Sequence, residues 1–301
     1  MSAQHNPNGG IPHPAVLEKN IGANPEYLDG ATDSINVLNR SGTTGSISIS
    51  PELFEKLYLS PQNRVAGQLR NTVGNPTPVA LVGFLLSLSP LSCILLGWRG
   101  AGGAGASDTT AYFFFGGMLM ILGGIGEFFL GNTFPSVVFT SFGAFWLTYG
   151  GTLQPFFNAY GAYSTDGVVA DGLKTTGFNA SFAFFMLWMA VLCLVFAVLA
   201  LRTNLVFFFI LLFLVPSFAC LAGAFWHTAE GSSATAASLL KAAGGLTLVV
   251  DLLGWYILLA VMLAAVDFPL VLPVGDLSTV IKGASERAKA RQQSGGNVEH
   301  A

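Results

Sequence analysis

The feature that most constrains this chain is a series of six apolar runs, each close to the length that crosses a bilayer. A helix needs about 20 predominantly apolar residues to span the hydrocarbon core. Of the 301 residues, 52% are hydrophobic and only 10% are charged, whereas soluble domains carry about 25% charged residues. The sequence therefore predicts an all-α membrane protein with six transmembrane helices, over approximately 76–98, 111–130, 134–155, 179–201, 205–226 and 244–266.

Polar segments flank this six-helix domain, which we place at residues 71–276. Residues 1–70 are rich in Asn, Gly, Pro and Ser without a lasting hydrophobic period, so they are predicted to be a mostly disordered tail. At 51–58 a short amphipathic helix and a loop are both compatible with the pattern. Residues 277–301 are predicted to form a C-terminal tail.

The distribution of basic residues predicts the orientation in the membrane. Most of the 13 Lys and Arg residues lie in the two tails, whereas the loops at the opposite end hold Arg99, Lys174 and Lys241. An even number of spans places both termini on one side, and the positive-inside rule places that side in the cytosol.

The first apolar run opens with Asn75-Pro76-Thr77-Pro78. Proline is tolerated in a first helical turn, where its missing N–H would be unpaired anyway. The Asn side chain can accept a hydrogen bond from one of the orphan backbone donors. We therefore expect a rigid helix start whose positive dipole end faces whatever enters from that side.

Residue patterns for catalysis are absent from the sequence. We find no nucleophile–base pair, no cluster of metal ligands and no phosphate-binding loop, and therefore expect neither an enzyme nor a bound cofactor or metal. Scattered Lys and Arg residues argue against nucleic acid as a partner. The three cysteines lie inside apolar runs and are expected to be small core residues.

Few ionisable residues lie within the spans. Glu127 is near the end of the second run, Asp251 about a third of the way into the sixth, and Asp267 at the end of the sixth. A charge at mid-membrane costs about 2.5–3.5 kcal/mol on insertion scales, so function is the default hypothesis. Glu127 and Asp251 are candidates for proton coupling. The alternatives are a wet, interfacial position for Glu127 and Asp267, and a helix–helix hydrogen bond for Asp251.

Several sequence blocks in order resemble the acetate uptake transporter family, the acetate/succinate permeases of bacteria and fungi. The family signature Asn-Pro-Ala-Pro-Leu-Gly-Leu is similar to 75–81 here, with Thr77, Val79 and Ala80 as differences. The resemblance continues through Glu127–Phe134, Thr140–Thr148, Gly150–Pro155 and Leu272–Asp276, and the long N-terminal segment is typical of a fungal-type member.

The resemblance implies six-helix protomers that assemble as homo-hexamers, each protomer with its own pore. It implies a substrate pathway past Asn75, Pro76, Thr77, Pro78, Asn132, Thr133 and Gln154, and an apolar constriction at Phe84, Phe142 and Leu211. The family commonly has Tyr at the second constriction position. Phe142 removes that hydroxyl, so the substrate preference of this chain stays open.

The resemblance implies a plasma-membrane transporter of acetate and related small monocarboxylates, coupled to protons as a symporter. A pore lined by phenyl rings and little charge passes neutral or weakly polar species. The alternatives are a channel or exporter for ammonia or another small neutral solute, and a non-transporting acetate-signalling membrane protein.

Overall fold

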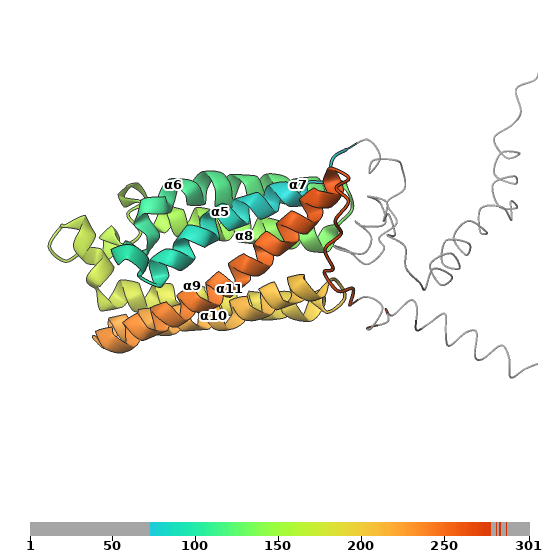
Figure 1. Ribbon diagram of the computed structural model, residues 1–301. Coiled ribbons are helices and arrows are strands. Elements are labelled where there is room, and N and C mark those ends of the chain that lie inside the picture. The colour runs from blue at the N-terminus through green and yellow to red at the C-terminus, as the bar shows by residue number, and fades with distance from the viewer. Residues whose placement is uncertain (1–72, 278–280, 282, 284–286, 288–301) are drawn as a thin grey trace, which may run out of the picture. The chain divides into compact units, whose positions relative to one another are not determined.

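Long helices dominate the computed structural model, which describes residues 73–277, 281, 283 and 287 (Figure 1). The second span is one continuous helix whose middle is a π-helical stretch, η3, between α6 and α7. This second span consists of α6 (Thr109–Ala111), η3 (Tyr112–Leu119) and α7 (Met120–Phe129). The other long helices are α5 (Thr77–Leu95), α8 (Thr133–Thr152), α9 (Thr176–Ala200), α10 (Leu205–Ala229) and α11 (Ser233–Ala265).

Each of the six predicted runs corresponds to a long helix, which confirms the predicted all-α membrane architecture. Five of these helical segments are long and apolar enough to cross a membrane by length and composition. The remaining one, α8, has 20 residues and packs against α7 and η3 within the same bundle. The predicted N-terminal tail, with its possible helix at 51–58, and most of the C-terminal tail lie outside the described residues.

The predicted start of the sixth span was wrong. Helix α11 begins at Ser233, well before residue 244, because an Ala- and Ser-rich segment extends the helix without raising its hydropathy. Lys241 therefore lies within α11 and not in a loop, and Asp251 is close to the middle of the helix. Alanine has the highest intrinsic helix propensity, which hydrophobicity alone does not register.

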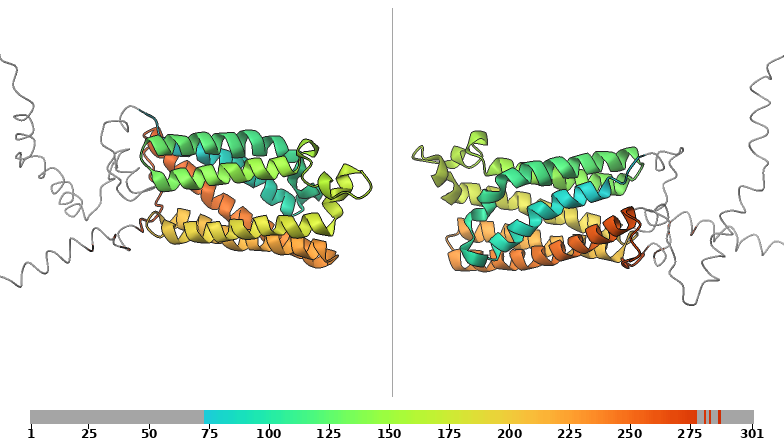
Figure 2. Two further views of the ribbon diagram at one scale, coloured as in Figure 1. Left: turned by 180° about the vertical axis from the view of Figure 1, so that it is seen from behind. Right: turned by 45° about the horizontal axis from the view of Figure 1, so that its top comes forward.

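The helices pack as two groups of three spans. One group contains α5, the α6–η3–α7 span and α8; the other contains α9, α10 and α11. In the described chain, the broad backbone contact between the groups runs along α5 and α11 (Figure 2). We call the space between the groups the seam. Along α8 the seam is closed by side chains, including the ring contacts of Phe134 with Phe196 and Phe207.

Two glycines of α7 allow α5 to approach closely. A Cβ atom added to Gly123 would lie 2.7 Å from Ala80 Cβ, and one added to Gly126 would lie 2.5 Å from Pro76 Cβ. Small residues at helix contacts let backbones approach in lipid, as the glycine density of the sequence suggests. The close contact brings the start of α5 beside the C-terminal turn of α7.

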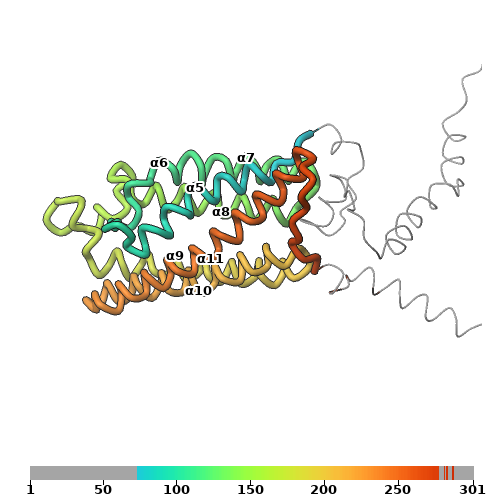
Figure 3. The backbone as a smooth tube through the Cα atoms, viewed as in Figure 1, coloured from blue at the N-terminus to red at the C-terminus, as the bar shows by residue number. Residues whose placement is uncertain are grey.

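Beyond α11 the chain returns along one end of the bundle to the start of α10 (Figure 3). Leu205 N–H donates to Gly275 O at 2.7 Å, and Asn204 pairs with Asp276 in an isolated antiparallel bridge. The Asn204 side chain caps α10 by accepting from Phe207 N–H at 2.7 Å. Residues 201–204 form the short connection between α9 and α10.

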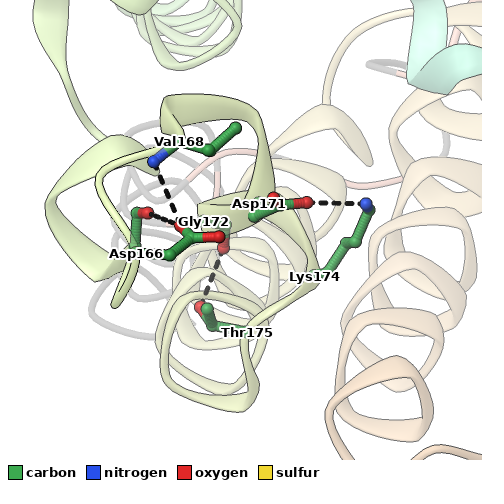
Figure 4. A network of polar contacts seen from close by, with 7 residues as sticks. Asp166, Val168, Asp171, Gly172, Lys174 and Thr175 are labelled. Atoms are coloured by element: carbon green, nitrogen blue, oxygen red, sulfur yellow. Dashed lines mark hydrogen bonds and ion pairs between the residues drawn. The ribbon is translucent and has the colours of Figure 1, made fainter.

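At the opposite end of the bundle a structured loop joins α8 to α9 through the short 3₁₀ helices η4 (Pro155–Phe157), η5 (Gly161–Tyr163) and η6 (Val169–Lys174). Asp166 Oδ1 accepts from Val168 N–H at 3.0 Å, and Lys174 Nζ donates to Asp171 Oδ1 at 2.7 Å (Figure 4). A hydrogen bond from the Ser164 side chain, followed by that of Val168 N–H, lowers the pKa of Asp166. The hydrogen bond to Asp171 raises the pKa of Lys174.

We expect Gly123→Ala to destabilise the protein, because its methyl group would also lie 2.8 Å from the Ala80 backbone nitrogen. Overpacking of this kind costs about 1–3 kcal/mol. The matched control is Gly245→Ala in α11, where no heavy atom lies within 4 Å of the added Cβ. The melting temperature in detergent should fall for Gly123→Ala and hold or rise for Gly245→Ala. Equal melting temperatures for the two variants would contradict the close contact.

Candidate functional site

A buried carboxylate joins three helix ends on the side of the bundle where α5 begins. Glu127, in the last turn of α7, is fully buried. Thr77 Oγ1 donates to Glu127 Oε1, and Asn132 Nδ2 donates to Glu127 Oε2 at 2.6 Å. We call Thr77, Glu127 and Asn132 the carboxylate cluster. The alternative of a wet, interfacial Glu127 was therefore wrong, since the close packing of α5 on α7 excludes solvent from it.

The start of α5 follows the sequence expectation closely. Asn75 Oδ1 accepts from Thr77 N–H at 2.9 Å, so the side chain satisfies one orphan donor of the helix. Pro76 occupies the capping position and Pro78 lies in the first turn, where neither needs an N–H partner. Asn75 thus caps the start of α5, and Thr77, the residue whose N–H it accepts from, is a member of the carboxylate cluster.

The other predicted pathway residues are more dispersed. Asn132 is buried, whereas Thr133, the first residue of α8, is exposed. Gln154 lies just beyond the C-terminus of α8, at the opposite end of that helix from Asn132. The structure therefore brings Asn75, Thr77 and Asn132 together with Glu127 and leaves Gln154 far from them along α8.

The three predicted constriction residues surround one apolar cavity in the seam. Phe84 of α5, Phe142 of α8 and Leu211 of α10 are buried and all line a cavity of about 20 Å³, measured as the volume open to the centre of a water molecule. The rings of Phe84 and Phe142 meet edge to face with centroids 6.3 Å apart. We call this space the inner cavity.

A second apolar cavity, of about 30 Å³ by the same measure, lies farther along the seam, and we call it the middle cavity. Phe84, Phe142 and Leu214 line both cavities, so these side chains form the partition between them. Leu214 was missed by the sequence analysis. It lies three residues after Leu211, and this helical spacing is the signal that could have found it.

The hydroxyl groups of the middle cavity are turned back to their own helices. Ser217 Oγ donates to Phe213 O at 2.7 Å, and Thr247 Oγ1 donates to Ala243 O at 2.9 Å. Among the described residues, none that lines either cavity carries a charge. A cavity of 10–15 Å³ by this measure holds about one water, so each space accommodates only water-sized solutes without side-chain movement.

Asp251 takes part in a helix–helix hydrogen bond. Its Oδ1 accepts from Ser89 Oγ at 2.6 Å, and Trp255 Nε1 donates to Ser89 Oγ at 3.0 Å. These contacts tie α11 to α5, and Asp251 is not among the residues that line the two cavities. Asp267 lies just beyond α11 and is exposed, in agreement with the wet alternative.

Six membrane-length helices around small apolar cavities define a polytopic helical membrane protein. Residues 58–279 match the GPR1/FUN34/yaaH family, and the chain belongs to that family. The resemblance drawn from the sequence motifs is thereby confirmed.

The chain is also similar to individual proteins. The chain is 46% identical over 234 residues to protein alcS of Aspergillus fumigatus, covering 77% of this chain and 86% of that protein. It is 30% identical over 210 residues to acetate transporter protein patA of Aspergillus clavatus, covering 68% of this chain and 79% of that protein. A solved structure of the bacterial acetate channel SatP is 26% identical, covering 67% of this chain and 99% of that chain with a TM-score of 0.49.

We expect Glu127→Ala to lower the melting temperature in detergent more than Glu127→Gln. The alanine variant removes the carboxylate that accepts from Thr77 Oγ1 and Asn132 Nδ2, and each hydrogen bond to a charged group contributes about 1.5–3 kcal/mol. Glutamine keeps an acceptor for one of them. Glu230→Ala is the control, since that side chain is 67% exposed. A melting temperature for Glu127→Ala equal to that of the control would contradict a cluster that joins the helix ends.

Proposed function

We propose that this chain is a plasma-membrane transporter of acetate and related small monocarboxylates, with both termini in the cytosol. The observation that carries the proposal is the placement of Phe84, Phe142 and Leu211 around one buried apolar cavity. Its support among relatives is the similarity to a protein named as an acetate transporter. The pathway runs along the seam, from the carboxylate cluster through the inner and middle cavities.

The apolar lining favours transport of the uncharged acid, and thus coupling to protons. Burying an unpaired charge is expensive, so a bare carboxylate meets a high barrier at the partition. Protonation removes that charge before the solute passes the rings of Phe84 and Phe142. One proton then moves with each carboxylate, which makes the process an electroneutral symport.

The carboxylate cluster is the place in this pathway where a proton can be exchanged. Its donors, Thr77 Oγ1 and Asn132 Nδ2, already hold one carboxylate, that of Glu127. The same hydroxyl and amide, beside the N-termini of α5 and α8, suit the carboxylate of a substrate. We assign proton coupling to Glu127 rather than to Asp251, because Asp251 lies at the α5–α11 contact and lines neither cavity.

We propose a homo-hexamer in which each protomer contains its own pathway. Large apolar side chains such as Phe114, Leu122 and Phe128 are exposed on the outside of the α6–η3–α7 span. A surface of this kind needs lipid or another copy of the chain as its neighbour. The complete lining of both cavities by one chain is compatible with a pathway in every protomer.

Export of ammonia is the second candidate function. The specific observation in its favour is the size of the two cavities, about 20 and 30 Å³, because neutral ammonia is close to water in size. Ammonia fits into both cavities without side-chain movement, whereas acetate does not. The phenyl ring of Phe142, which presents no hydroxyl, suits either neutral solute.

Uptake of labelled acetate into a host lacking its own carboxylate transporters tests the proposal. We expect saturable uptake that rises with an inward proton gradient and falls when the gradient is collapsed. If acetate uptake is absent in both conditions and the protein increases ammonium release, the result favours the second candidate. No flux of either solute, with acetate-dependent growth responses intact, would favour a signalling protein instead.

Leu211→Ala should widen the inner cavity and admit larger monocarboxylates such as butyrate. The matched control is Leu212→Ala, the next residue of α10, whose side chain is 36% exposed. We would measure initial uptake rates of acetate and butyrate at equal surface levels of the two variants. The ratio of butyrate to acetate should rise several-fold only in Leu211→Ala. An unchanged ratio in that variant would exclude a size-limiting role for Leu211.

Phe142→Tyr should change acetate kinetics, because it adds one hydroxyl at the partition between the cavities. If the hydroxyl donates to the carbonyl oxygen of the uncharged acid, the hydrogen bond contributes about 0.5–1.5 kcal/mol, so KM should fall by about two- to tenfold. If the hydroxyl finds only apolar neighbours, it destabilises the closed pathway and the uptake rate changes instead. Superimposable uptake curves for this variant and the wild type, measured against acetate concentration, would remove Phe142 from the pathway.

A further inference from the structure

An open pocket lies at the end of the bundle opposite the carboxylate cluster. It has a volume of about 240 Å³, again measured at the centre of a water molecule, which is several times that of the inner or middle cavity. Thr152, the last residue of α8, and Phe178 and Ser181, in the first two turns of α9, place it at the level of the helix ends. Its lining is completed by Ala159, Tyr163, Phe182 and Phe185.

The structured loop between α8 and α9 holds the rim of this pocket in place. The rings of Tyr160 and Tyr163 both meet the ring of Phe178 edge to face, with centroids 6.2 and 5.9 Å apart. The Thr175 side chain caps α9 by accepting from Phe178 N–H at 3.3 Å. Thr175 Oγ1 also donates to Gly172 O at 2.8 Å, within the network of Figure 4. The rim is therefore built by hydrogen bonds that fix the loop onto the start of α9.

A pair of stacked rings links the lining of this pocket to the lining of the middle cavity. Phe185 lines the pocket and Phe145 lines the middle cavity. Their ring centroids are 6.1 Å apart and their planes differ by 17°. On its other side, the Phe145 ring meets Phe218, also in the wall of the middle cavity, with centroids 5.1 Å apart. Each ring of this pair therefore belongs to the wall of one of the two spaces.

The position of this ring pair in the bundle supports rotation of its side chains. The seam is closed by close backbone contact on the side of α5 and α11, but between α8 and α9 it is closed by side chains. Phe185 is half-buried, and Phe145 lies two turns from the C-terminus of α8, roughly 10 Å deep at 1.5 Å per residue. Side chains rotate far more readily than packed helices separate.

We propose that this pocket is a vestibule that receives the small carboxylic acid, and that Phe145 and Phe185 form a second gate between the vestibule and the middle cavity. The inference rests on the proposed function and adds a second site to it. Hydroxyls of Thr152, Tyr163 and Ser181 are in the lining among aromatic rings, and no lining residue is charged. The Thr152 hydroxyl donates to Thr148 O at 2.8 Å, so it can serve a bound acid only as an acceptor. This chemistry suits a small monocarboxylic acid that places its carboxyl group on the hydroxyls and its methyl group on the rings.

Cysteine modification tests the vestibule directly. In a background with the three native cysteines replaced by Ala, the variants are Ser181→Cys and, as matched control, Phe184→Cys, an exposed position that contacts Trp226. A bulky membrane-impermeant thiol reagent is added outside intact cells, and labelled acetate uptake and the extent of labelling are both measured. We expect modification of Ser181→Cys to slow uptake at least tenfold, acetate to slow that modification, and Phe184→Cys to keep its uptake rate.

The gate is tested by Phe185→Trp, which should slow acetate uptake several-fold, and Phe185→Ala, which should speed it, at equal surface levels. Unchanged uptake after complete modification of Ser181→Cys would overturn the vestibule, and unchanged rates in both Phe185 variants would overturn the gate.

Absence of wild-type acetate uptake would contradict the proposed function. In that case the vestibule is tested by labelling alone, in intact or permeabilised cells. Slower labelling of Ser181→Cys in the presence of acetate supports the vestibule, and an unchanged labelling rate overturns it.

Discussion

The close packing of α5 between α7, in its own group, and α11, in the other group, is the constraint on which the rest of the structure depends. On one side Gly123 and Gly126 bring α7 against it. On the other, a Cβ atom added to Gly254 of α11 would lie 2.7 Å from Leu85 Cδ2, and Ser89 donates to Asp251. Between these contacts, Phe84 of α5 is directed into the seam, where it lines both cavities. The carboxylate cluster, the partition and the helix–helix hydrogen bond are all arranged by this one helix.

The apolar lining of the seam and the carboxylate cluster have complementary consequences. The cluster offers hydrogen-bond donors to a carboxylate, whereas the cavities beyond it offer rings and aliphatic side chains. In such surroundings an unpaired charge is costly, but a methyl group and a neutral carboxyl are not. The order of these environments along the seam fits a solute that is recognised as an acid at a helix end and crosses the partition without charge.

Periodicity and composition predicted the helices well, because a span must satisfy its backbone hydrogen bonds internally in lipid. They failed at the start of α11, where alanine and serine extend a helix that hydropathy does not detect. Sequence analysis predicted Asn75, Thr77 and Asn132 as pathway residues. It predicted Glu127 as a candidate for proton coupling, in a separate hypothesis. Only the structure showed that Glu127 is the group that Thr77 and Asn132 hold, because residues 77 and 127 are brought together by glycine packing rather than by any local spacing. The partner of Asp251, and the Phe145–Phe185 pair, likewise depend on contacts between distant helices.

The central claim is that the seam passes the uncharged acid, so that each carboxylate carries one proton and no net charge. The most direct measurement combines electrical recording with a lumenal pH indicator on vesicles that contain the purified protein, after addition of acetate outside. The account predicts acidification of the lumen faster than in protein-free vesicles, without a transport current at any imposed membrane potential. A current of inward anions that is not accompanied by acidification would show that the carboxylate crosses with its charge, and would contradict the account.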